Sequence, residues 1–552
     1  MPDQSESTPL ATQVLIAGAG PVGLFAAVEL GRRGVNCVIV EPRPTVNRAR
    51  PRAKTLNMRT MEHLQRIGLA ERLREHAMLP TSWSQDVAFC TTLLGDELAR
   101  FTGVLGLSDD EDCSPELGQQ LPQYILEELL REVVEELPNV TVLLGAKVEG
   151  LDQSPDQVTV QLREATGDVR AITTKYVLGA DGANSAVRKA IGANYVGSRS
   201  LTPNLGLVFQ THELDDILVE RPAVQYWLLN DETPGLMGPI DLDGTWWLIA
   251  FGIDNAMGPI DTPAMIAGAA GKRLNATVLS TDPWTARMEL VDRSRDRRVF
   301  LLGDAAHLNP PFGGHGLNTG IGDAVDLGWK IAARLQGWGG DGLLDSYESE
   351  RRPLHARVIE AAVANNAALS ADLIRAAAGA PGATAATARA AISQTIHQMK
   401  AAEYFSLDLV LGHRYTSSPV IWEPDTPEAP DQAALWATRV RSGGRLPHVW
   451  LKPGFSTLHC VGTTFTLLAL GSADTSAFEQ AAEQVGVPLS TVDLRQYDLG
   501  AELGAELVLV RPDHHVAWHG DMAPTDTNEL LQHVAGLQPR PQTVPRDGVI
   551  NG

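Results

Sequence analysis

The sequence Val299–Asn318, VFLLGDAAHLNPPFGGHGLN, carries the pattern on which our interpretation of the fold depends. The apolar run Val299–Leu302 predicts a short strand, and it ends in Gly303 and Asp304. A proline pair and a glycine-rich run follow, and a helical pattern begins at about residue 320. A strand end that offers a carboxylate, then a glycine-freed backbone, then a helix N-terminus can hold a polar cofactor of anionic character.

A second pattern of the same kind opens the chain. The apolar run Gln13–Ala17 leads directly into a G-x-G-x-x-G turn at Gly18, Gly20 and Gly23, and a helical pattern and a second apolar run, which ends at Glu41, follow it. The glycines permit a tight turn, close approach of a pyrophosphate and close helix–strand packing. Glu41 lies 18 residues after Gly23, near the spacing of about 20 expected for an acid on a ribose hydroxyl. We therefore predict a Rossmann-like dinucleotide-binding domain rather than a glycine-rich turn without a ligand.

Composition excludes several classes of protein. A chain of 552 residues with 44% hydrophobic and 20% charged residues is typical of a soluble globular protein of two or three domains. The net charge of −22 disfavours nucleic-acid and anionic-membrane partners. The chain has no signal-peptide pattern and no apolar stretch long enough to span a membrane. Scattered cysteines without a CxxC pair argue against disulfide scaffolds and thiolate metal sites and favour a cytoplasmic location (Cys37, Cys90, Cys113, Cys460).

A basic loop follows the first domain pattern. Arg48, Arg50, Arg52 and Lys54 place four cations within seven residues. They could simply be solvated, but directly after a dinucleotide-binding pattern they could also neutralise a pyrophosphate, and we favour this second interpretation for Arg52.

An acidic turn follows a predicted hairpin. The runs Val158–Leu162 and Ala171–Leu178 alternate as paired strands, and the second leads into Asp181 and Gly182. This predicts a charge near the cofactor end of a parallel sheet. Asp181 or Ser185 could equally cap a helix N-terminus, and both interpretations can hold together.

The middle of the chain changes character. Residues 197–285 contain alternating and aromatic runs separated by turns, which predicts an antiparallel sheet inserted into the first domain, whereas residues 80–120 show no clear period. Any single aromatic side chain here fits an ordinary core, but a sheet laid over a cofactor is where an aromatic substrate would lie (Tyr226, Trp227, Trp246, Trp247).

The last third of the chain predicts helices, a linker and a separate unit. A helix is expected over 343–376, a break or mobile loop over 377–388 and a linker over 406–430, which is rich in proline from residue 419. Residues 431–552 predict a small thioredoxin-like α/β domain, which cannot perform dithiol chemistry because it lacks a CxxC motif. A role in packing or assembly is therefore expected for it.

These stretches together resemble the flavin-dependent aromatic hydroxylases, the single-component group A FAD monooxygenases with the p-hydroxybenzoate hydroxylase fold. The resemblance covers nearly the whole chain, because the G-x-G-x-x-G turn with Glu41, the Asp181 turn and the Gly303-Asp304 turn occur in the family's order. The most similar branch contains phenol hydroxylases such as 2,4-dichlorophenol and 2-hydroxybiphenyl monooxygenases. Motifs shared with this branch are Pro51-Arg52-Ala53, Leu121-Pro122-Gln123, Gln225-Tyr226-Trp227, Arg445-Leu446-Pro447-His448 and the Arg511-Pro512-Asp513 to Val516-Ala517-Trp518 ending.

The resemblance implies an α/β fold with an FAD-binding domain formed by residues 1–196 and 286–405. An antiparallel-sheet substrate domain would occupy 197–285, a linker 406–430, and a thioredoxin-like domain 431–552.

It also implies which positions contact FAD. The pyrophosphate would lie on Gly18, Gly20, Val22 and Gly23, the adenosine ribose on Glu41, and the adenine on the Val148 backbone. Arg52 and Gln123 would contact the pyrophosphate and ribityl region, and Asp304 a ribityl hydroxyl, with Asp181 in the middle fingerprint. Pro311 would line the isoalloxazine, and backbone donors of Gly316, Leu317 and Asn318 would meet the flavin N1/O2 edge.

Two positions depart from the phenol-hydroxylating branch. Lys54 stands where that branch usually has a histidine linked to activation of the phenol, and Gln120 stands where it often has an aspartate. A desolvated Lys54 could act as a base or as a cation that stabilises a phenolate. His315 is the other candidate for this role, although a structural loop histidine is at least as good an interpretation, and Tyr226 is a third catalytic candidate.

The implied activity is hydroxylation of a phenolic or aromatic substrate that consumes NAD(P)H and molecular oxygen through a flavin C4a-hydroperoxide. The missing phenol-activating pair leaves open a Baeyer–Villiger or epoxidising monooxygenase acting on a polyketide-like or antibiotic substrate. A flavoprotein without oxygenase activity and a nicotinamide dehydrogenase are the rivals from other classes. We expect transient NADH or NADPH binding, no metal, a small aromatic substrate as partner, and a homodimer.

Overall fold

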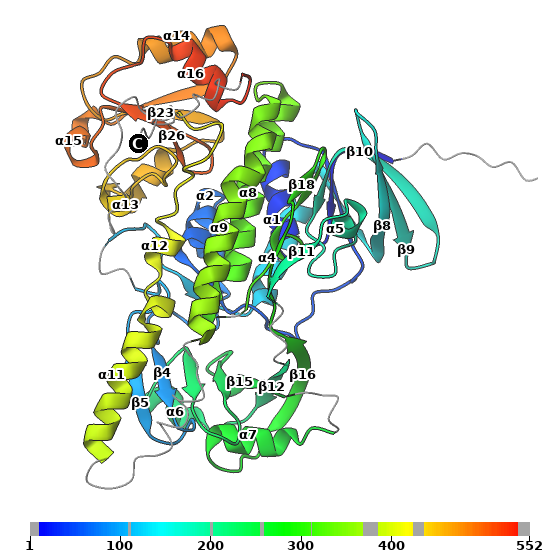
Figure 1. The fold of residues 1–552 in the computed structure, drawn as a ribbon, viewed down its shortest axis with the longest axis vertical. Helices are drawn as coiled ribbons and strands as arrows, with labels where there is room; N and C mark the ends of the chain where they lie inside the picture. Colours follow the sequence, from blue (N-terminus) through cyan, green and yellow to red (C-terminus); the bar gives the residue numbers. More distant parts are fainter. Residues whose placement is uncertain are drawn as a thin grey trace, which may run out of the picture. The chain divides into compact units, whose positions relative to one another are not determined.

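The computed structural model describes residues 10–108, 112–198, 203–253, 259–310, 312–367, 385–422 and 435–538, which form two compact units (Figure 1). Among these residues, the first unit takes the chain up to Gly328 together with Arg352–Leu411, and the second takes Trp329–Arg351 together with the chain from Gly412 onward. The predicted boundaries keep 286–405 in one domain, so they differ from these units at residues 329–351.

The first unit is built on a mostly parallel sheet with the strand order β18-β19-β10-β1-β2-β7. Its central strands are apolar runs buried on both faces, as parallel strands beneath helices require. The parallel pairs join β1 (Leu10–Ala17) to β2 (Cys37–Glu41) and β10 (Val169–Gly179), β2 to β7 (Val140–Leu144), and β10 to β19 (Val299–Leu301). Together with α1 (Pro21–Gly31), which follows β1, this arrangement confirms the predicted Rossmann-like fold.

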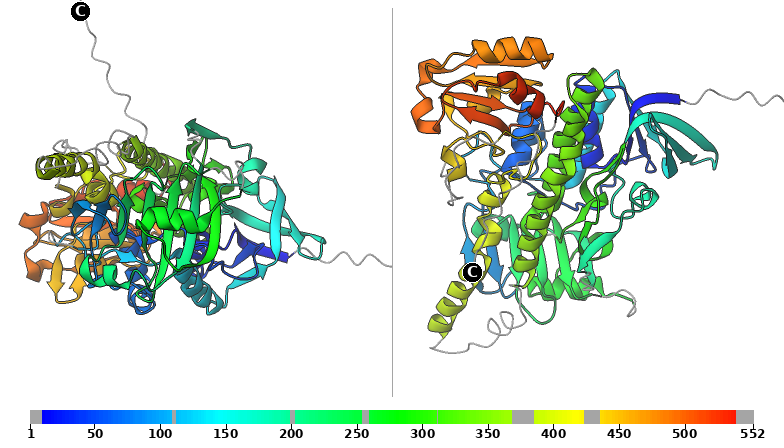
Figure 2. Two further views of the ribbon diagram at one scale, coloured as in Figure 1. Left: turned by 90° about the horizontal axis from the view of Figure 1, so that it is seen from below. Right: turned by 45° about the horizontal axis from the view of Figure 1, so that its top comes forward.

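Antiparallel strands extend this sheet. β8 (Ala146–Gln153) pairs with β9 (Val158–Glu164), and β9 pairs with β10, which confirms the predicted hairpin. Figure 2 shows this extension in cyan beside the first blue strand.

A seven-stranded sheet forms the second layer of this unit, and its hairpin strands β12 to β15 confirm the predicted antiparallel sheet. It also recruits β4 and β5 from the segment 80–120, which the sequence pattern leaves without a period. All four residues of β4 are buried, so hydrophobic and polar side chains do not alternate along it, and it pairs in parallel with β13. In sheet order the strands are β16 (Thr277–Thr285), β12 (Pro203–Gln210), β15 (Thr245–Phe251), β14 (Gly235–Pro239), β13 (Gln225–Leu228), β4 (Val87–Cys90) and β5 (Glu97–Phe101).

The two faces of this sheet have different coverings. Tyr226 and Trp246 belong to a core shared with α6 (Asp215–Glu220) and α7 (Thr262–Ala270). Their neighbours Trp227 and Trp247 belong to a core shared with Phe312 and with residues of α11 (Ala385–Tyr404). Successive residues of a strand point to opposite faces, so only the second pair faces the Phe312 side of the sheet.

Shorter elements complete the first unit. The strands β3 and β6 pair with one another, and β11, β17 and β20 form a small three-stranded sheet. Their bounds are β3 (Thr55–Leu56), β6 (Gln119–Gln120), β11 (Tyr195–Ser198), β17 (Met288–Val291), β18 (Arg295–Asp296) and β20 (His307–Leu308). The helices are α2 (Met58–Arg66), α3 (Ala70–Glu75), α4 (Gln123–Glu135), α5 (Ala186–Ala190) and α12 (Leu407–Val410).

Two long helices contribute residues to both units. α8 spans His315–Gln336, so it begins five residues before the predicted start at Gly320. α9 spans Asp341–Ala367. Residues 368–384 and 423–434 lie outside the described part of the chain. They include the end of the predicted second helix, most of the predicted loop over 377–388 and the last eight residues of the predicted linker.

The second unit contains a four-stranded sheet with the order β24-β23-β25-β26. β23 and β24 are parallel and the other pairs are antiparallel, which is the arrangement of a thioredoxin-like core and confirms that prediction. β24 was not predicted, because its residues are half-buried or exposed. The elements are β23 (Phe465–Ala469), α14 (Ser476–Val485), β24 (Leu489–Asp493), β25 (Leu507–Val510), β26 (Val516–Gly520) and α16 (Thr527–Val534), with β21 (Trp450–Lys452), β22 (Phe455–Ser456), α13 (Leu435–Thr438) and α15 (Gly500–Leu503) around them.

A buried charge network ties the helical part of the second unit to its sheet. Arg511 donates to both Glu350 oxygens, at 2.7 and 2.9 Å, and to Asp513 at 2.6 Å. Lys330 donates to Glu350 at 2.5 Å. Two cations thus face two carboxylates in a fully buried site, an arrangement in which the loss of any one member leaves an uncompensated charge.

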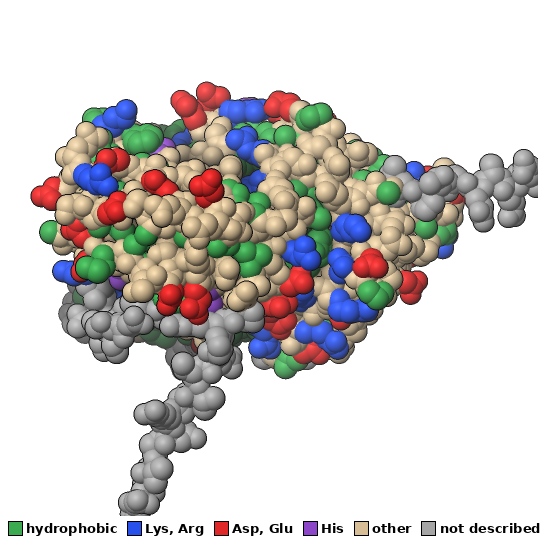
Figure 3. All heavy atoms as spheres, turned by 90° about the horizontal axis from the view of Figure 1, so that it is seen from above, with side chains coloured by type: hydrophobic (Ala, Val, Ile, Leu, Met, Phe, Trp, Pro, Cys, Tyr) green, Lys and Arg blue, Asp and Glu red, His purple; other side chains and the backbone are tan. Residues whose placement is uncertain are grey.

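The surface is mixed in charge. On the face that Figure 3 shows, acidic and basic side chains lie interspersed rather than gathered into one basic patch. In the described part of the chain, no helix combines the length and the apolar character needed to cross a membrane.

Candidate active site

Three turns meet at one edge of the parallel sheet. Ala17 is in register with Gly179, and Gly179 with Leu301, so the turns that follow β1, β10 and β19 begin side by side. The carboxyl ends of parallel strands form the binding edge in doubly wound sheets. The three sequence fingerprints, far apart in the chain, therefore form one site.

The first turn is shaped to admit a ligand. Gly18 has φ +100°, and a Cβ there would lie 2.4 Å from the Ala180 carbonyl oxygen. A Cβ at Gly23 would lie 2.0 Å from the Gly18 oxygen, so both positions require glycine for packing. At Gly20 a Cβ would meet nothing within 4 Å, and α1 begins there without a side-chain cap. This open, uncapped helix N-terminus fits a pyrophosphate.

Val22 joins the first turn to the third. The Val22 side chain packs against Gly303 and Gly320, where an added Cβ would approach it to 3.1 and 2.7 Å. Val22 therefore sets the spacing of α1 and α8, in addition to its expected place at the pyrophosphate.

Glu41 lies at the end of β2, close to the glycine turn. Its Oε2 accepts the Ala19 N–H at 2.8 Å, and its Oε1 accepts the Arg43 N–H at 3.0 Å and Nε at 2.7 Å. Burial opposes ionisation, but these hydrogen bonds lower the pKa of Glu41 overall, so the carboxylate is charged. A carboxylate keeps further acceptor sites, and a ribose hydroxyl at Glu41 remains compatible with the geometry.

Asp181 caps a helix, as one of the two interpretations predicted. Its Oδ2 accepts the N–H groups of Ala186 and Val187 at 2.7 and 3.2 Å, while Ser185 caps Arg188 N at 2.8 Å. Burial raises the pKa of Asp181, and its Oδ1 is buried without a hydrogen-bond partner among the described residues. This free oxygen is available to a ligand hydroxyl.

Asp304 and Arg52 form the charged part of the site. Asp304 is exposed to solvent but is surrounded by enough protein to raise its pKa by desolvation, an effect that His307 and Arg52 oppose through their charges. Arg52 is also exposed, and its backbone has φ +48°, a conformation that non-glycine residues adopt at a cost. An exposed carboxylate and an exposed guanidinium fit the ribityl hydroxyls and the phosphates of FAD.

The first residue of α4, Gln123, is hydrogen-bonded to the basic loop. The Gln123 N–H donates to the carbonyls of Pro51 and Ala53, at 3.0 and 2.9 Å, and its side-chain amide donates to Glu127 at 2.7 Å. Gln123 therefore braces the backbone on both sides of Arg52. Val148 is buried on β8, where it pairs with Leu162, in the core that also contains Ala17 and Val40 at the ends of β1 and β2.

The glycine loop ends in the first turn of α8. Gly313 and Gly314 have φ +77° and +67°, a left-handed conformation that interrupts the helical backbone just before α8. Because the helix begins at His315, the expected donors Gly316, Leu317 and Asn318 lie in its first turn, where backbone N–H groups lack intrahelical partners. Pro311, the predicted isoalloxazine contact, lies outside the described residues.

The Asn318 side chain fastens this turn to β3. It accepts the Asn57 N–H at 3.0 Å and donates to the carbonyls of Thr55 and Gly314, at 2.9 and 2.6 Å. Gln120, the second departure from the phenol-hydroxylating pattern, donates to Thr55 Oγ1 at 2.8 Å and so supports the same strand.

Lys54 is placed on the aromatic face of the seven-stranded sheet. Its ammonium lies 4.1 Å from the centroid of the Trp247 ring and donates to the Arg52 carbonyl at 2.9 Å. Desolvation lowers the pKa of Lys54 to about 8. Within the described part of the chain, no carboxylate lies within ion-pair distance of it.

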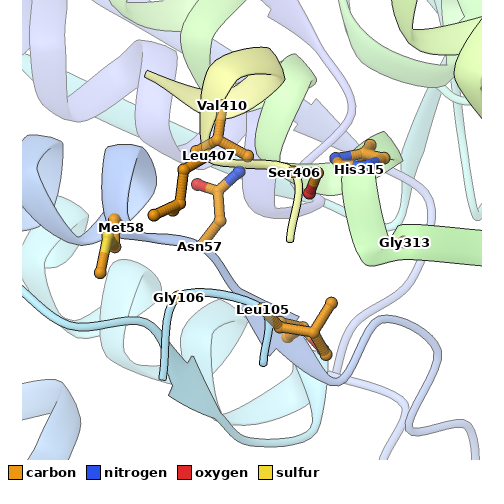
Figure 4. Close-up of a pocket in the computed structure, with 10 residues that line it drawn as sticks. Asn57, Met58, Leu105, Gly106, Gly313, His315, Ser406, Leu407 and Val410 are labelled. Carbon is orange, nitrogen blue, oxygen red and sulfur yellow. The ribbon is translucent and has the colours of Figure 1, made fainter. Parts of the chain in front are cut away.

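His315 lines a small pocket beside the glycine loop (Figure 4). It is buried, and desolvation lowers its pKa to about 4, so the ring is neutral at physiological pH. Its Nε2 has no hydrogen-bond partner among the described residues. The pocket is mostly apolar, with Met58, Leu105, Leu407 and Val410 in its wall.

Tyr226 is not brought to this site. Its hydroxyl donates to the Arg221 carbonyl at 2.7 Å and accepts the Ala223 N–H at 3.0 Å, in the core on the opposite face of the sheet from Trp227 and Lys54. We therefore withdraw it as a catalytic candidate, because strand alternation turns its side chain to the other face.

Sequence reasoning missed a hub beneath the Gly303 turn. Asp323 accepts the Gly303 N–H at 3.1 Å, His307 Nε2 at 3.1 Å and His355 Nε2 at 2.8 Å, and all three side chains are fully buried. Their potential ligand atoms lie within 4.8 Å of one another, as in a metal site, but the hydrogen bonds already account for the arrangement. The available signal was the presence of three charged residues among apolar neighbours in the middle of the helix: Asp323, Asp326 and Lys330.

Comparisons with known proteins show the family to which the chain is related. Two family models match, an FAD binding domain over residues 11–362 and the C-terminal domain of aromatic-ring hydroxylases over residues 439–537. Aklavinone 12-hydroxylase RdmE of Streptomyces purpurascens is 31% identical over 94% of this chain and 97% of its own. The 2,4-dichlorophenol 6-monooxygenase of Cupriavidus pinatubonensis is 29% identical over 93% of this chain and 94% of its own. The structure of the rebeccamycin biosynthetic enzyme RebC with reduced flavin is similar with a TM-score of 0.86 and 33% identity, covering 96% of this chain and all of that one.

Proposed function

Because the chain belongs to the FAD-dependent aromatic-ring hydroxylases, we propose that it is a monooxygenase that hydroxylates a phenolic substrate bound as its anion. In the balanced reaction, the aromatic C–H, O2, NAD(P)H and a proton give the phenolic C–OH, NAD(P)+ and water. One oxygen atom enters the ring, and the nicotinamide supplies the two electrons that reduce the other.

The observation that carries the proposal is the Lys54 ammonium, which has no carboxylate partner among the described residues. A cation that is partly desolvated, held over the Trp247 ring and without a carboxylate nearby among the described residues favours an anionic ligand. A phenolate would supply the missing charge, and its ring would lie on the aromatic face formed by Trp227 and Trp247.

Lys54 can act on the phenol in two ways. As a neutral amine it can accept the phenolic proton, and as an ammonium it can stabilise the phenolate that results. A phenolate ring carbon is more electron-rich than that of the phenol, which is the requirement for attack on an electrophilic oxygen. His315 is the weaker candidate for the base, since burial lowers its pKa to about 4.

Bound FAD supplies the activation of oxygen, and this chain holds and orients it. Gly18, Gly20 and Gly23 would receive the pyrophosphate, and Asp304 and Arg52 the ribityl and phosphate groups. The first-turn N–H groups of α8 would face the flavin edge that becomes negative on reduction.

A larger substrate of several fused rings is the second candidate. It is favoured by the name of the relative RdmE, an aklavinone hydroxylase, and by the absence here of the phenol-activating histidine. A Baeyer–Villiger or epoxidising reaction on such a substrate is the alternative chemistry, and it differs from hydroxylation in its product.

The test is substrate-stimulated oxidation of NADH and NADPH by the purified flavoprotein. A panel of simple phenols and polycyclic phenols would be compared with the O-methyl ether of each, which has the same rings but cannot form a phenolate. We expect stimulation by phenols, little by the ethers, and a loss of about tenfold or more in kcat/KM for Lys54→Met that Lys54→Arg partly restores. Equal stimulation by phenols and their ethers would refute the anionic substrate.

A further inference from the structure

The end of α11 carries buried polar residues that the function described so far does not use. Lys400 is 0% exposed, and Glu403 and Tyr404 are each 2% exposed. They lie three and four residues apart on one helix, within reach of one another and of several neighbouring segments. Burying an ammonium and a carboxylate is costly, so their placement calls for a physical reason.

Lys400 connects this helix to α9 and to the aromatic face of the sheet. Its ammonium donates to Glu403 Oε2 at 2.7 Å and to the Asn365 carbonyl at 3.0 Å. It also lies 4.5 Å from the centroid of the Trp227 ring. The Trp227 indole in turn donates to the Tyr404 hydroxyl, so the same turn of α11 fixes the ring from two sides.

Glu403 connects the helix to the glycine loop. Its carboxylate faces the Gly313 N–H, which favours the charged form of Glu403 and so works against the rise of its pKa on burial. Gly313 is the left-handed residue that precedes Gly314 and the first turn of α8. Phe312, on the other side of Gly313, packs on Trp227 with ring centroids 6.1 Å apart and planes 17° from parallel. The loop is therefore held at Phe312 by aromatic packing, and at Gly313 its N–H faces a carboxylate.

We propose that Glu403 is a positioning residue that fixes the Gly313 turn for the flavin edge, with Lys400 as its counter-ion. A carboxylate suits this role because a charged acceptor holds a backbone N–H more tightly than a neutral one. Gly313 has no side chain through which packing could fix it, so its backbone N–H is the group by which a neighbouring side chain can position it. By setting Gly313, Glu403 sets the direction in which the N–H groups of Gly316–Asn318 point.

The electrostatics support the pairing. Burial raises the pKa of Glu403, an effect that Lys400 and the Gly313 N–H oppose, and burial lowers the pKa of Lys400, an effect that Glu403 opposes. Each group thus maintains the charge of the other. Removing Lys400 alone should lead Glu403 to take up a proton and weaken its hold on Gly313.

The test compares Glu403→Leu and Lys400→Met with the double variant K400M/E403L. The dissociation constant of FAD would be measured by titrating the full-length apoprotein without substrate, and apoprotein stability by its melting temperature, so the outcome does not depend on the proposed hydroxylation. The double variant replaces the ion pair by apolar side chains of similar volume, which generally restores stability. Glu97→Leu is the control, because it removes one of the two carboxylate partners of Arg100, on β5 of the same unit.

We expect each single variant to weaken FAD binding, about tenfold for Glu403→Leu. In the double variant the melting temperature should recover, because no unpaired buried charge remains. The FAD affinity should stay low and the absorption bands of the bound flavin should differ from those of wild type, because no carboxylate faces the Gly313 N–H. Glu403→Gln, which keeps an acceptor, should fall between wild type and Glu403→Leu. Wild-type FAD affinity in the double variant or in Glu403→Leu would overturn the proposal and leave the pair a packing feature alone.

Discussion

The Lys54 ammonium lies 4.1 Å from the centroid of the Trp247 ring, on the face of the seven-stranded sheet that also carries Trp227. A cation is attracted to the negative face of an indole, and desolvation at the same time lowers the pKa of Lys54 to about 8. The position therefore combines an aromatic surface with a charge that is ready to pair with an anion.

The affinity for an anionic ligand should depend on the protonation of Lys54. With a pKa of about 8 in the free protein, Lys54 is mostly charged at lower pH and mostly neutral at higher pH. The affinity for a nitrophenol that is fully ionised throughout should therefore fall as pH rises above about 8, by up to tenfold per unit. Titration calorimetry in two buffers should show proton uptake on binding above this pH, and Lys54→Met should abolish both effects.

The two glycines at the start of α1 should behave differently. Gly18→Ala places a Cβ 2.4 Å from the Ala180 oxygen at φ +100°, so the apoprotein should lose about 1–3 kcal/mol of stability. Gly20→Ala meets no protein atom within 4 Å, so its apoprotein should melt like wild type while FAD binding weakens about tenfold or more. Urea unfolding and FAD titration measure the two effects, and normal FAD affinity of Gly20→Ala would exclude a pyrophosphate there.

Tyr226 should prove structural. Tyr226→Phe loses the hydrogen bonds to Arg221 and Ala223, which should cost about 1 kcal/mol of unfolding free energy. Since the hydroxyl faces away from Lys54, kcat should stay within about twofold of wild type. A fall of about a hundredfold in kcat, with an unfolding free energy equal to that of wild type, would instead show that Tyr226 takes part in catalysis.

Substitutions at Asp323 and Asp304 should have different effects, the first on the stability of the apoprotein and the second on FAD binding. Asp323→Asn replaces one acceptor oxygen by an NH2 donor, which would face the three groups that now donate to Asp323. The unfolding free energy of the apoprotein should therefore fall by about 1–3 kcal/mol. Asp304→Asn, at an exposed position, should change apoprotein stability by less than about 0.5 kcal/mol but weaken FAD binding. A matching loss of stability in both variants would argue that Asp304 also serves the fold.

The local patterns were sufficient for the cofactor half of the fold. The G-x-G-x-x-G turn, Glu41 and the Gly303 turn each lie at a strand end, and the carboxyl ends of parallel strands necessarily share one edge, so their meeting follows from the topology. The helix start at His315 was harder to predict, since glycines at 316 and 320 disguise the first turn of a helix.

The substrate side depends on long-range pairing that no local pattern contains. β4 joins the sheet by pairing Ala88 with Tyr226, and that register also decides which face Tyr226 occupies. A shift of one residue exchanges Tyr226 for Trp227 on the aromatic face, so a shared motif cannot by itself choose between them. Lys54 meets Trp247 across a still longer stretch of sequence. The homodimer stays a prediction.

The most direct test of the central claim is mass spectrometry of the product formed under 18O2 with the phenol that best stimulates NAD(P)H oxidation. We predict a product that gains one 18O atom on the ring, with all carbon–carbon bonds intact and one NAD(P)H consumed per product. Hydrogen peroxide without a hydroxylated product, an oxygen derived from water, or a ring-expanded ester would contradict the assignment as an aromatic hydroxylase.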